Sequence, residues 1–138
     1  MLNKPHLGSV DITIDNFSDR ASYLTDVPFD LLNAFIRFYR DGNPQTVYFD
    51  AEGWDYYIII AWDMVFIITS KGNGGYMLHE IVVKTDDMVR ELIKDLEDNL
   101  DDWKNWDGSG KDGDSQHYDT ADKRESLLAE LKSLIRIT

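Results

Sequence analysis

The stretch that decides the fold runs from residue 46 to residue 84 and reads TVYFDAEGWDYYIIIAWDMVFIITSKGNGGYMLHEIVVK. It is rich in β-branched and aromatic residues, which favour β-strands. Short turn sequences divide it into four parts, which span 46–51, 54–61, 64–70 and 76–84. Connections this short join antiparallel neighbours, so the stretch predicts a four-stranded meander. Its second and third parts are apolar at most positions, which predicts inner strands covered on both faces or nearly so.

Helix signals lie on both sides of the meander. Before it, Asp26 and Pro28 open a helix, because Asp accepts hydrogen bonds from the free amides of a first turn and Pro has no amide to lose there. Gly42 ends that helix, since Gly tolerates the left-handed conformation that follows a last turn. After the meander, Thr85 is expected to cap a second helix, whose apolar residues recur at three- and four-residue steps.

The remaining periodic segments complete the order of elements. Apolar and polar residues alternate over 10–14, which is the period of a half-buried strand. A last helix begins at Asp119 or Thr120, after a loop from 105 to 118 that we expect to be flexible. We therefore predict a single α+β domain over residues 1–138, in which an antiparallel meander sheet of four to five strands packs with about three helices in the order β-α-β-β-β-β-α-α.

Composition excludes several classes of function. The chain has 138 residues, with 26 acidic and 14 basic side chains and a net charge of −12. That charge argues against binding a nucleic-acid backbone or an anionic membrane, both of which attract Lys and Arg. Cysteine is absent, which removes disulfides, thiolate metal ligands and a cysteine nucleophile. The start lacks the pattern of a secretory signal, and Asp63 interrupts the longest apolar run, so we expect a soluble cytoplasmic protein.

No motif for a catalytic, cofactor or metal site is complete. His79-Glu80 lacks the second His of a zinc-protease helix, because position 83 is Val83. Gly110-Lys111 lacks the other Gly and the Ser or Thr of a phosphate-binding loop. The Asp- and Gly-rich loop from 107 to 114 fits no register of a regular calcium loop, which leaves open only a weak, irregular cation site. We therefore expect a protein that is not an enzyme and has no catalytic residues, cofactor or regular metal site.

Acidic residues are concentrated in one part of the chain. Between residues 86 and 102, eight acidic side chains accompany two basic ones, a local balance of −6. Like charges at helical spacings repel one another and Asp is a poor helix former, so this run lowers the stability of its own helix. Two explanations remain open, namely solubility and the binding of a cationic partner.

We predict a partner-binding face on this acidic run and on the Trp residue that follows it. Trp103 continues the apolar face of the helix and is expected in the core, whereas Trp106 lies past the helix end and is the better interface candidate. The predicted contact residues are Asp95, Asp98, Asp101, Asp102, Trp106 and Asp107.

Three stretches also support a likeness to known proteins: Val47-Tyr48-Phe49-Asp50, Trp54-Asp55-Tyr56-Tyr57 and the acidic helix that ends in Asp101-Asp102-Trp103. With its small size, acidity and lack of cysteine and catalytic motifs, the chain resembles the immunity proteins of bacterial polymorphic and contact-dependent toxin systems. The resemblance implies a cytoplasmic inhibitor that binds a toxin domain, often a basic nuclease, and blocks its active site with carboxylates. It assigns no role to an individual residue.

The sequence leaves three alternative hypotheses for the function. The first is a non-enzymatic protein that neutralises a basic, nuclease-like toxin through its acidic face, with neither a nucleic acid nor a membrane as partner. The second is a small enzyme or small-molecule-binding domain with an aromatic-lined pocket on the sheet, formed by Tyr48, Trp54, Tyr56 and Tyr57 with His79 nearby. The third is an adaptor or an oligomeric structural protein.

Overall fold

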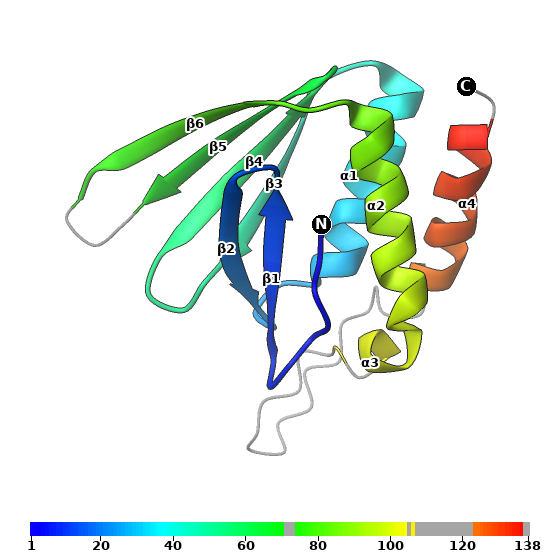
Figure 1. Ribbon diagram of the computed structural model, residues 1–138, viewed down its shortest axis with the longest axis horizontal. Coiled ribbons are helices and arrows are strands. Elements are labelled where there is room, and N and C mark those ends of the chain that lie inside the picture. Colours follow the sequence, from blue (N-terminus) through cyan, green and yellow to red (C-terminus); the bar gives the residue numbers. More distant parts are fainter. Residues whose placement is uncertain (71–73, 105, 107–122, 137–138) are drawn as a thin grey trace.

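The computed structural model describes residues 1–70, 74–104, 106 and 123–136. Within these residues the chain is α+β, as predicted, with a four-stranded antiparallel sheet, a separate two-stranded sheet and four helices. The elements are β1 (Ser9–Ile14), β2 (Phe17–Ser22), α1 (Val27–Asp41), β3 (Gln45–Asp50), β4 (Asp55–Ala61), β5 (Met64–Ser70), β6 (Tyr76–Val82), α2 (Thr85–Asp98), α3 (Leu100–Lys104) and α4 (Arg124–Arg136). Figure 1 shows α1 and α2 on one side of the large sheet, with α4 on the side of these helices away from the sheet.

The predicted meander is confirmed. Its strand order is β3-β4-β5-β6, all antiparallel, so β4 and β5 are the inner strands. One face of the sheet packs into the core, where Phe49, Tyr56 and Ile58 are fully buried. The other face is less covered than predicted, because the helices pack on one side only: Tyr57 of β4 is 41% exposed. The expectation of inner strands covered on both faces or nearly so is therefore met on the core face, whereas on the other face the residues of β4 and β5 are half-buried except for the exposed Tyr57.

Two elements are absent from the predicted order. β2 pairs with β1 in a hairpin whose turn holds Asp15 at a positive φ of 53°. Its sequence, FSDRAS, has no β-branched residue and lacks strict alternation, which is why strand patterns do not find it. The helix after β6 ends at Asp98, and the short α3 follows after Asn99. The described part of the last helix starts at Arg124, so its predicted start at residue 119 or 120 lies outside the described residues.

The predicted ends of α1 are confirmed. The Asp26 carboxylate accepts a hydrogen bond from the Phe29 amide at 3.3 Å, and Pro28 lies in the first turn. At the other end Gly42 has φ 72°, and its amide donates to the Phe38 carbonyl at 3.0 Å. The apolar face predicted for α1 is likewise buried, including Leu31 and Phe35.

The predicted cap of α2 is wrong. Lys84 occupies the N-cap position and makes no side-chain capping bond. Thr85 is the first residue of the helix, and its fully buried hydroxyl points to the β4–β5 turn, where it accepts from the Asp63 amide at 2.9 Å. In return the Asp63 carboxylate accepts from the Thr85 amide at 3.1 Å. A residue of the preceding turn, 22 positions away in sequence, therefore satisfies a free amide of α2.

A buried Arg joins α4 to the rest of the fold. Arg124 contacts the Asp26 carboxylate at 2.8 Å, so the same Asp that caps α1 also pairs with the first residue of α4. Its guanidinium also donates to the carbonyl of Trp103 at 2.9 Å and to that of Trp106 at 2.5 Å. The Arg124 guanidinium is buried, and its N–H groups donate to Asp26 and to both Trp carbonyls. These bonds fix the positions of α1, α3 and α4 relative to one another.

Candidate functional site

Asp95, the first residue of the predicted contact face, holds the start of the chain against α2. Its carboxylate accepts from the N-terminal ammonium at 2.7 Å and from the Leu2 amide at 2.9 Å. Glu91, one turn earlier, also accepts from that ammonium. Met1 and Leu2 are both buried, so these carboxylates satisfy polar groups that the fold removes from water. Asp95 therefore has a structural role.

The other carboxylates of the acidic run also have partners inside the protein. Asp98 pairs with Lys94 at 2.8 Å, and Asp102 lies 4.0 Å from Lys4. The exposed Asp101 has an intramolecular interaction as well. Glu97, the residue before Asp98 in α2, pairs with Lys132 of α4 at 2.8 Å.

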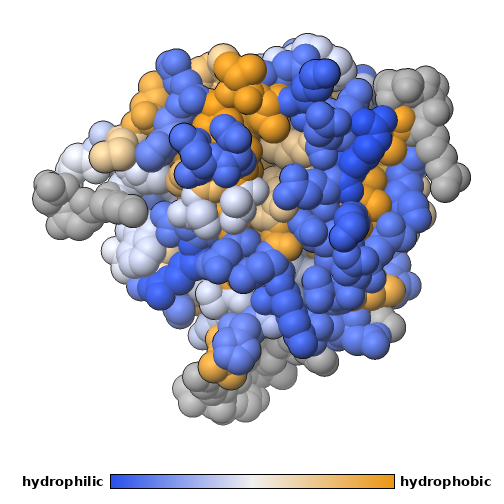
Figure 2. All heavy atoms as spheres, in the orientation of Figure 1, coloured by the Kyte–Doolittle hydropathy of each residue, from blue (hydrophilic) through white to orange (hydrophobic). Residues whose placement is uncertain are grey.

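The fold therefore lowers the net negative charge around the acidic run of residues 86–102. It brings three cations from distant positions, the N-terminal ammonium, Lys4 and Lys132, into contact with carboxylates between residues 86 and 102. They reduce the local balance from −6 to −3. Figure 2 shows that hydrophilic residues cover much of the surface on the side of the helices.

Trp106 is buried, so the prediction of an exposed interface residue is wrong. It is only 3% exposed, and its indole N–H donates to the Thr25 carbonyl at 3.1 Å. Its ring lies 5.3 Å from that of Trp103, which is buried as predicted. α3 turns the chain back toward α1, and the Arg124 guanidinium holds the carbonyls of both Trp residues. Asp107, the last predicted contact residue, lies outside the described residues, as does most of the 105–118 loop.

The face of the four-stranded sheet that α1 and α2 leave uncovered is apolar, and we call it the outer face. One row across it joins Tyr48, Tyr57, Ile68 and Leu78 by direct strand pairing. The next row joins Ile59 and Phe66. In the first row, Tyr48 is 37% exposed, Tyr57 41% and Leu78 57%. An antiparallel sheet with a solvated face is normally polar there, so this composition is unusual for a surface open only to water.

The charged residues at the strand positions of the outer face are all acidic. The register places Asp50, Asp55 and Glu80 on it, and its strand positions include no Lys, Arg or His. Asp55 accepts a hydrogen bond from the Tyr48 hydroxyl at 3.1 Å and another from the Ser70 hydroxyl. These bonds fix the Tyr48 ring beside that of Tyr57, with their centroids 5.2 Å apart. The outer face thus has a rigid aromatic centre with carboxylates at its margins.

The aromatic pocket of the second predicted function is not formed. Strand alternation separates its residues, because Tyr48 and Tyr57 lie on the outer face and Tyr56 is fully buried on the inner face. Trp54 lies under the guanidinium of Arg20, 4.7 Å from its carbon to the ring centroid. His79 also lies on the inner side, where its ring is 5.5 Å from Phe17.

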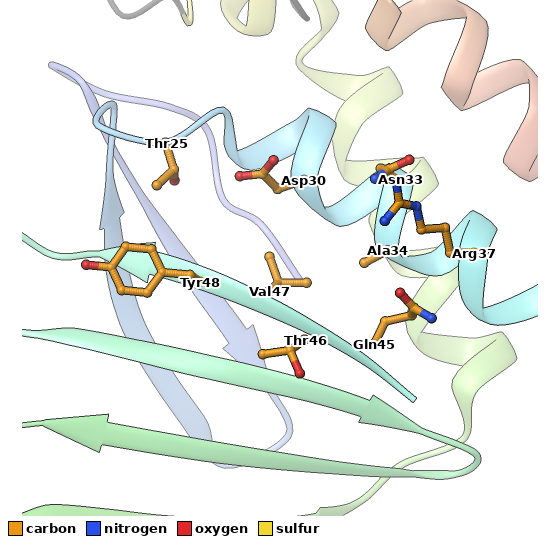
Figure 3. A pocket seen from close by; sticks show the side chains of 9 residues that line it. All are labelled: Thr25, Asp30, Asn33, Ala34, Arg37, Gln45, Thr46, Val47 and Tyr48. Atoms are coloured by element: carbon orange, nitrogen blue, oxygen red, sulfur yellow. The ribbon is translucent and has the colours of Figure 1, made fainter. Parts of the chain in front are cut away.

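A groove between α1 and the edge strand β3 forms the second candidate site. It has a volume of about 270 Å³. Its lining comprises Thr25, Asp30, Asn33, Ala34, Arg37, Gln45, Thr46, Val47 and Tyr48. Figure 3 shows Thr25, Asp30 and Tyr48 toward one end, and Asn33, Arg37 and Gln45 toward the other. The groove is not predictable from the sequence, because its residues meet only when α1 packs beside β3.

Two groups in the groove have no partner among the residues that the structure describes. Among the described residues, the Asp30 carboxylate has neither a hydrogen bond nor an ion pair. Burial, and secondarily the nearby Asp26, raises the pKa of Asp30 to about 6. The Thr25 hydroxyl is buried and has no hydrogen-bond partner within the described part of the chain. The ionised Asp30 carboxylate only accepts hydrogen bonds, so this end of the groove favours a ligand that donates them.

No protein-family model, curated protein or solved structure matches the chain in the comparisons with known proteins. Within the part that the structure describes, no cluster of three or more His, Asp or Glu side chains is placed to hold a metal ion. The described helices include none with the length and apolar character to cross a membrane.

Proposed function

We propose that this protein is a non-enzymatic binding protein that inhibits a basic protein partner, as the resemblance to immunity proteins implies, and that it binds this partner with its outer face. The observation that carries the proposal is the uncovered aromatic and aliphatic surface around Tyr48, Tyr57 and Leu78. Contiguous exposed apolar surface on a folded domain marks interaction sites, and aromatic residues are enriched at the centres of interfaces.

The size of the outer face suits the centre of an interface. Four strands about 4.8 Å apart, each rising roughly 3.4 Å per residue over its central residues, give a face of about 15 by 20 Å. A standard interface buries about 800 Å² on each partner, so this face supplies the apolar centre and the surrounding loops supply a polar rim. Tyr48 and Tyr57 already have fixed neighbours, which lowers the entropy lost on binding.

The sign of charge favours a cationic partner over a second copy of the chain. Two outer faces in contact would place Asp50, Asp55 and Glu80 near the same carboxylates of the other copy, which is unfavourable in an interface. A partner with Lys or Arg around an apolar patch would instead pair with them. The net charge of −12 adds long-range attraction for such a partner. The carboxylates of α2 and α3 contribute to this field from the other side of the sheet.

The proposal is tested with the partner obtained by co-expression with the neighbouring open reading frame. Leu78→Asp places a charge at an exposed position of the outer face, and we expect it to weaken the complex about tenfold or more. Leu100→Asp is the matched control, because Leu100 is an exposed leucine of α3. Asp98→Lys tests the acidic run directly. Each affinity is measured by calorimetry at two salt concentrations, together with the inhibition of the partner's activity.

The salt dependence of binding and the effects of the variants can each contradict this function. We expect affinity to fall as salt rises, since part of the attraction is between exposed charges. Equal affinities for the wild type and Leu78→Asp would rule out the outer face as the contact surface. A tenfold loss in Asp98→Lys, with Leu78→Asp unaffected, would return the contact surface to α2. Binding that is indifferent to salt would contradict the basic partner.

A further inference from the structure

The groove between α1 and β3 adjoins the outer face. Thr46 and Tyr48 line the groove, and the strand register also places both on the outer face. β3 is an edge strand of the four-stranded sheet, so the groove lies where the outer face ends. A protein segment that lies across the outer face and passes the edge at β3 therefore reaches the groove directly (Figure 3).

One end of the groove has the chemistry of a cation site. The Asp30 carboxylate supplies a negative charge that no cation neutralises among the described residues. The Thr25 hydroxyl is buried beneath this end of the groove and has no hydrogen-bond partner in the part of the chain that the structure describes. Tyr48 adds an aromatic ring whose face attracts a cation, and its own hydroxyl is held by Asp55. An ammonium or guanidinium group in the groove would pair with the Asp30 carboxylate.

The other end of the groove has the chemistry of a backbone site. Asn33 and Gln45 carry amide groups, and Arg37 carries a guanidinium without a hydrogen bond or ion pair among the described residues. These groups donate to carbonyl oxygens, and Arg37 disfavours a second cation there. Asp30 and Arg37 are seven residues apart on α1, which is about 10 Å along the helix axis. Three residues of extended chain cover the same distance.

The volume of the groove limits the occupant. At about 270 Å³ it lies below the roughly 300–1,000 Å³ of typical small-molecule and cofactor pockets. It has room for one long side chain and a short piece of backbone. We infer that the groove is an anchor pocket for one Lys or Arg side chain of the basic partner, whose charged end contacts Asp30 while the adjoining backbone contacts Asn33, Arg37 and Gln45. This inference rests on the proposed function and assigns the partner's anchoring residue to a defined place.

The pocket is tested first with small probes on the intact protein. N-acetyl-arginine amide and N-acetyl-lysine amide are titrated at millimolar concentration, and backbone amide shifts are followed by NMR. We expect concentration-dependent shifts along α1 and at Gln45, and smaller shifts or none with the uncharged N-acetyl-glutamine amide. Asp30→Asn should remove the response to both cationic probes. Asp41→Asn is the matched control, because Asp41 is an exposed carboxylate on the same helix and does not line the groove.

The complex provides the second test. We expect Asp30→Asn to weaken the partner about tenfold, and Asp41→Asn to change the affinity less than twofold. A glutamine probe that shifts the same amides as strongly as the arginine probe would overturn the cation pocket. So would an unchanged partner affinity in Asp30→Asn. If Leu78→Asp still weakens the complex in that case, only the anchor pocket fails; if Leu78→Asp has no effect either, the proposed function fails with it.

Discussion

The carboxyl group of Asp30 provides a prediction about stability that does not depend on a partner. Burial, with a smaller contribution from the neighbouring Asp26, raises its pKa from 3.8 to about 6. The folded protein therefore holds this proton more tightly than the unfolded chain does. The resulting stabilisation is fully present below pH 4 and is lost as the pH rises through 6, where the folded protein must carry a poorly solvated charge.

Asp30→Asn removes that charge at similar size and should stabilise the protein above pH 6. Two pKa units correspond to about 3 kcal/mol. Because the carboxylate is partly exposed and solvent screens it, we expect a smaller gain of about 1 kcal/mol at pH 7.5. At pH 3.5 both side chains are neutral, so the two proteins should unfold with nearly the same free energy. The same substitution is expected to weaken partner binding, so stability and binding should change in opposite directions.

Urea unfolding followed by Trp fluorescence, repeated from pH 3.5 to 8, measures this difference. Asp41→Asn serves again as the control, since it is exposed at the end of the same helix and should change stability by at most a few tenths of a kcal/mol. A destabilised Asp30→Asn at pH 7.5, or a gain of the same size at pH 3.5 and pH 7.5, would refute the reasoning.

Three other substitutions test contacts that hold the fold. Arg124→Met removes the guanidinium that pairs with the buried Asp26 carboxylate, and we expect the free energy of unfolding in urea to fall by about 3 kcal/mol. Asp95→Asn removes the charge that pairs with the N-terminal ammonium, and should cost about 1 to 2 kcal/mol by thermal unfolding. Asp63→Ala removes the bond to the first amide of α2 and places Ala at φ 55°, for an expected loss of about 1 to 2 kcal/mol.

Conservative variants and specific measurements distinguish the loss of each named contact from a nonspecific loss of stability. Asp63→Asn keeps a side-chain oxygen and tolerates the left-handed conformation, so it should recover most of the lost stability. An Asp95→Asn protein that keeps full stability but loses partner binding would restore Asp95 as a contact residue. Arg124→Met unfolding at the wild-type urea midpoint would show that the buried pair does not hold α4 in place.

The parts of the fold that were predictable are those encoded in local patterns. The β3–β6 meander follows from dense β-branched and aromatic residues between short turns, and α1 follows from Asp26, Pro28 and Gly42. β2 was not predictable in this way, because the pairing with β1 and not its own composition makes FSDRAS a strand. Thr85 was wrongly assigned as a cap because its hydroxyl bonds to a turn that is distant in sequence.

The candidate site was less predictable, since it depends on contacts between distant segments. The acidic run looked isolated because the sequence does not show that the N-terminal ammonium and Lys132 pack against it. Trp106 looked exposed because it follows a helix end, although the turn of α3 carries it into the core. The sequence signal for the outer face is that the strands are apolar on both sides, but that pattern alone does not distinguish a buried face from an exposed apolar one.

The ion pair between Asp26 and Arg124 spans 98 positions of the chain, which has a consequence for its synthesis. At about 5 to 20 residues per second, a ribosome needs roughly 5 to 20 seconds to translate the interval between them. During that time the nascent chain already holds α1, but lacks both the guanidinium and the apolar side of α4 that later cover it. The packing of α4 on α1 is therefore among the last contacts of the described fold that can form during translation, because Arg124 and the apolar residues of α4 follow every other described element in the chain.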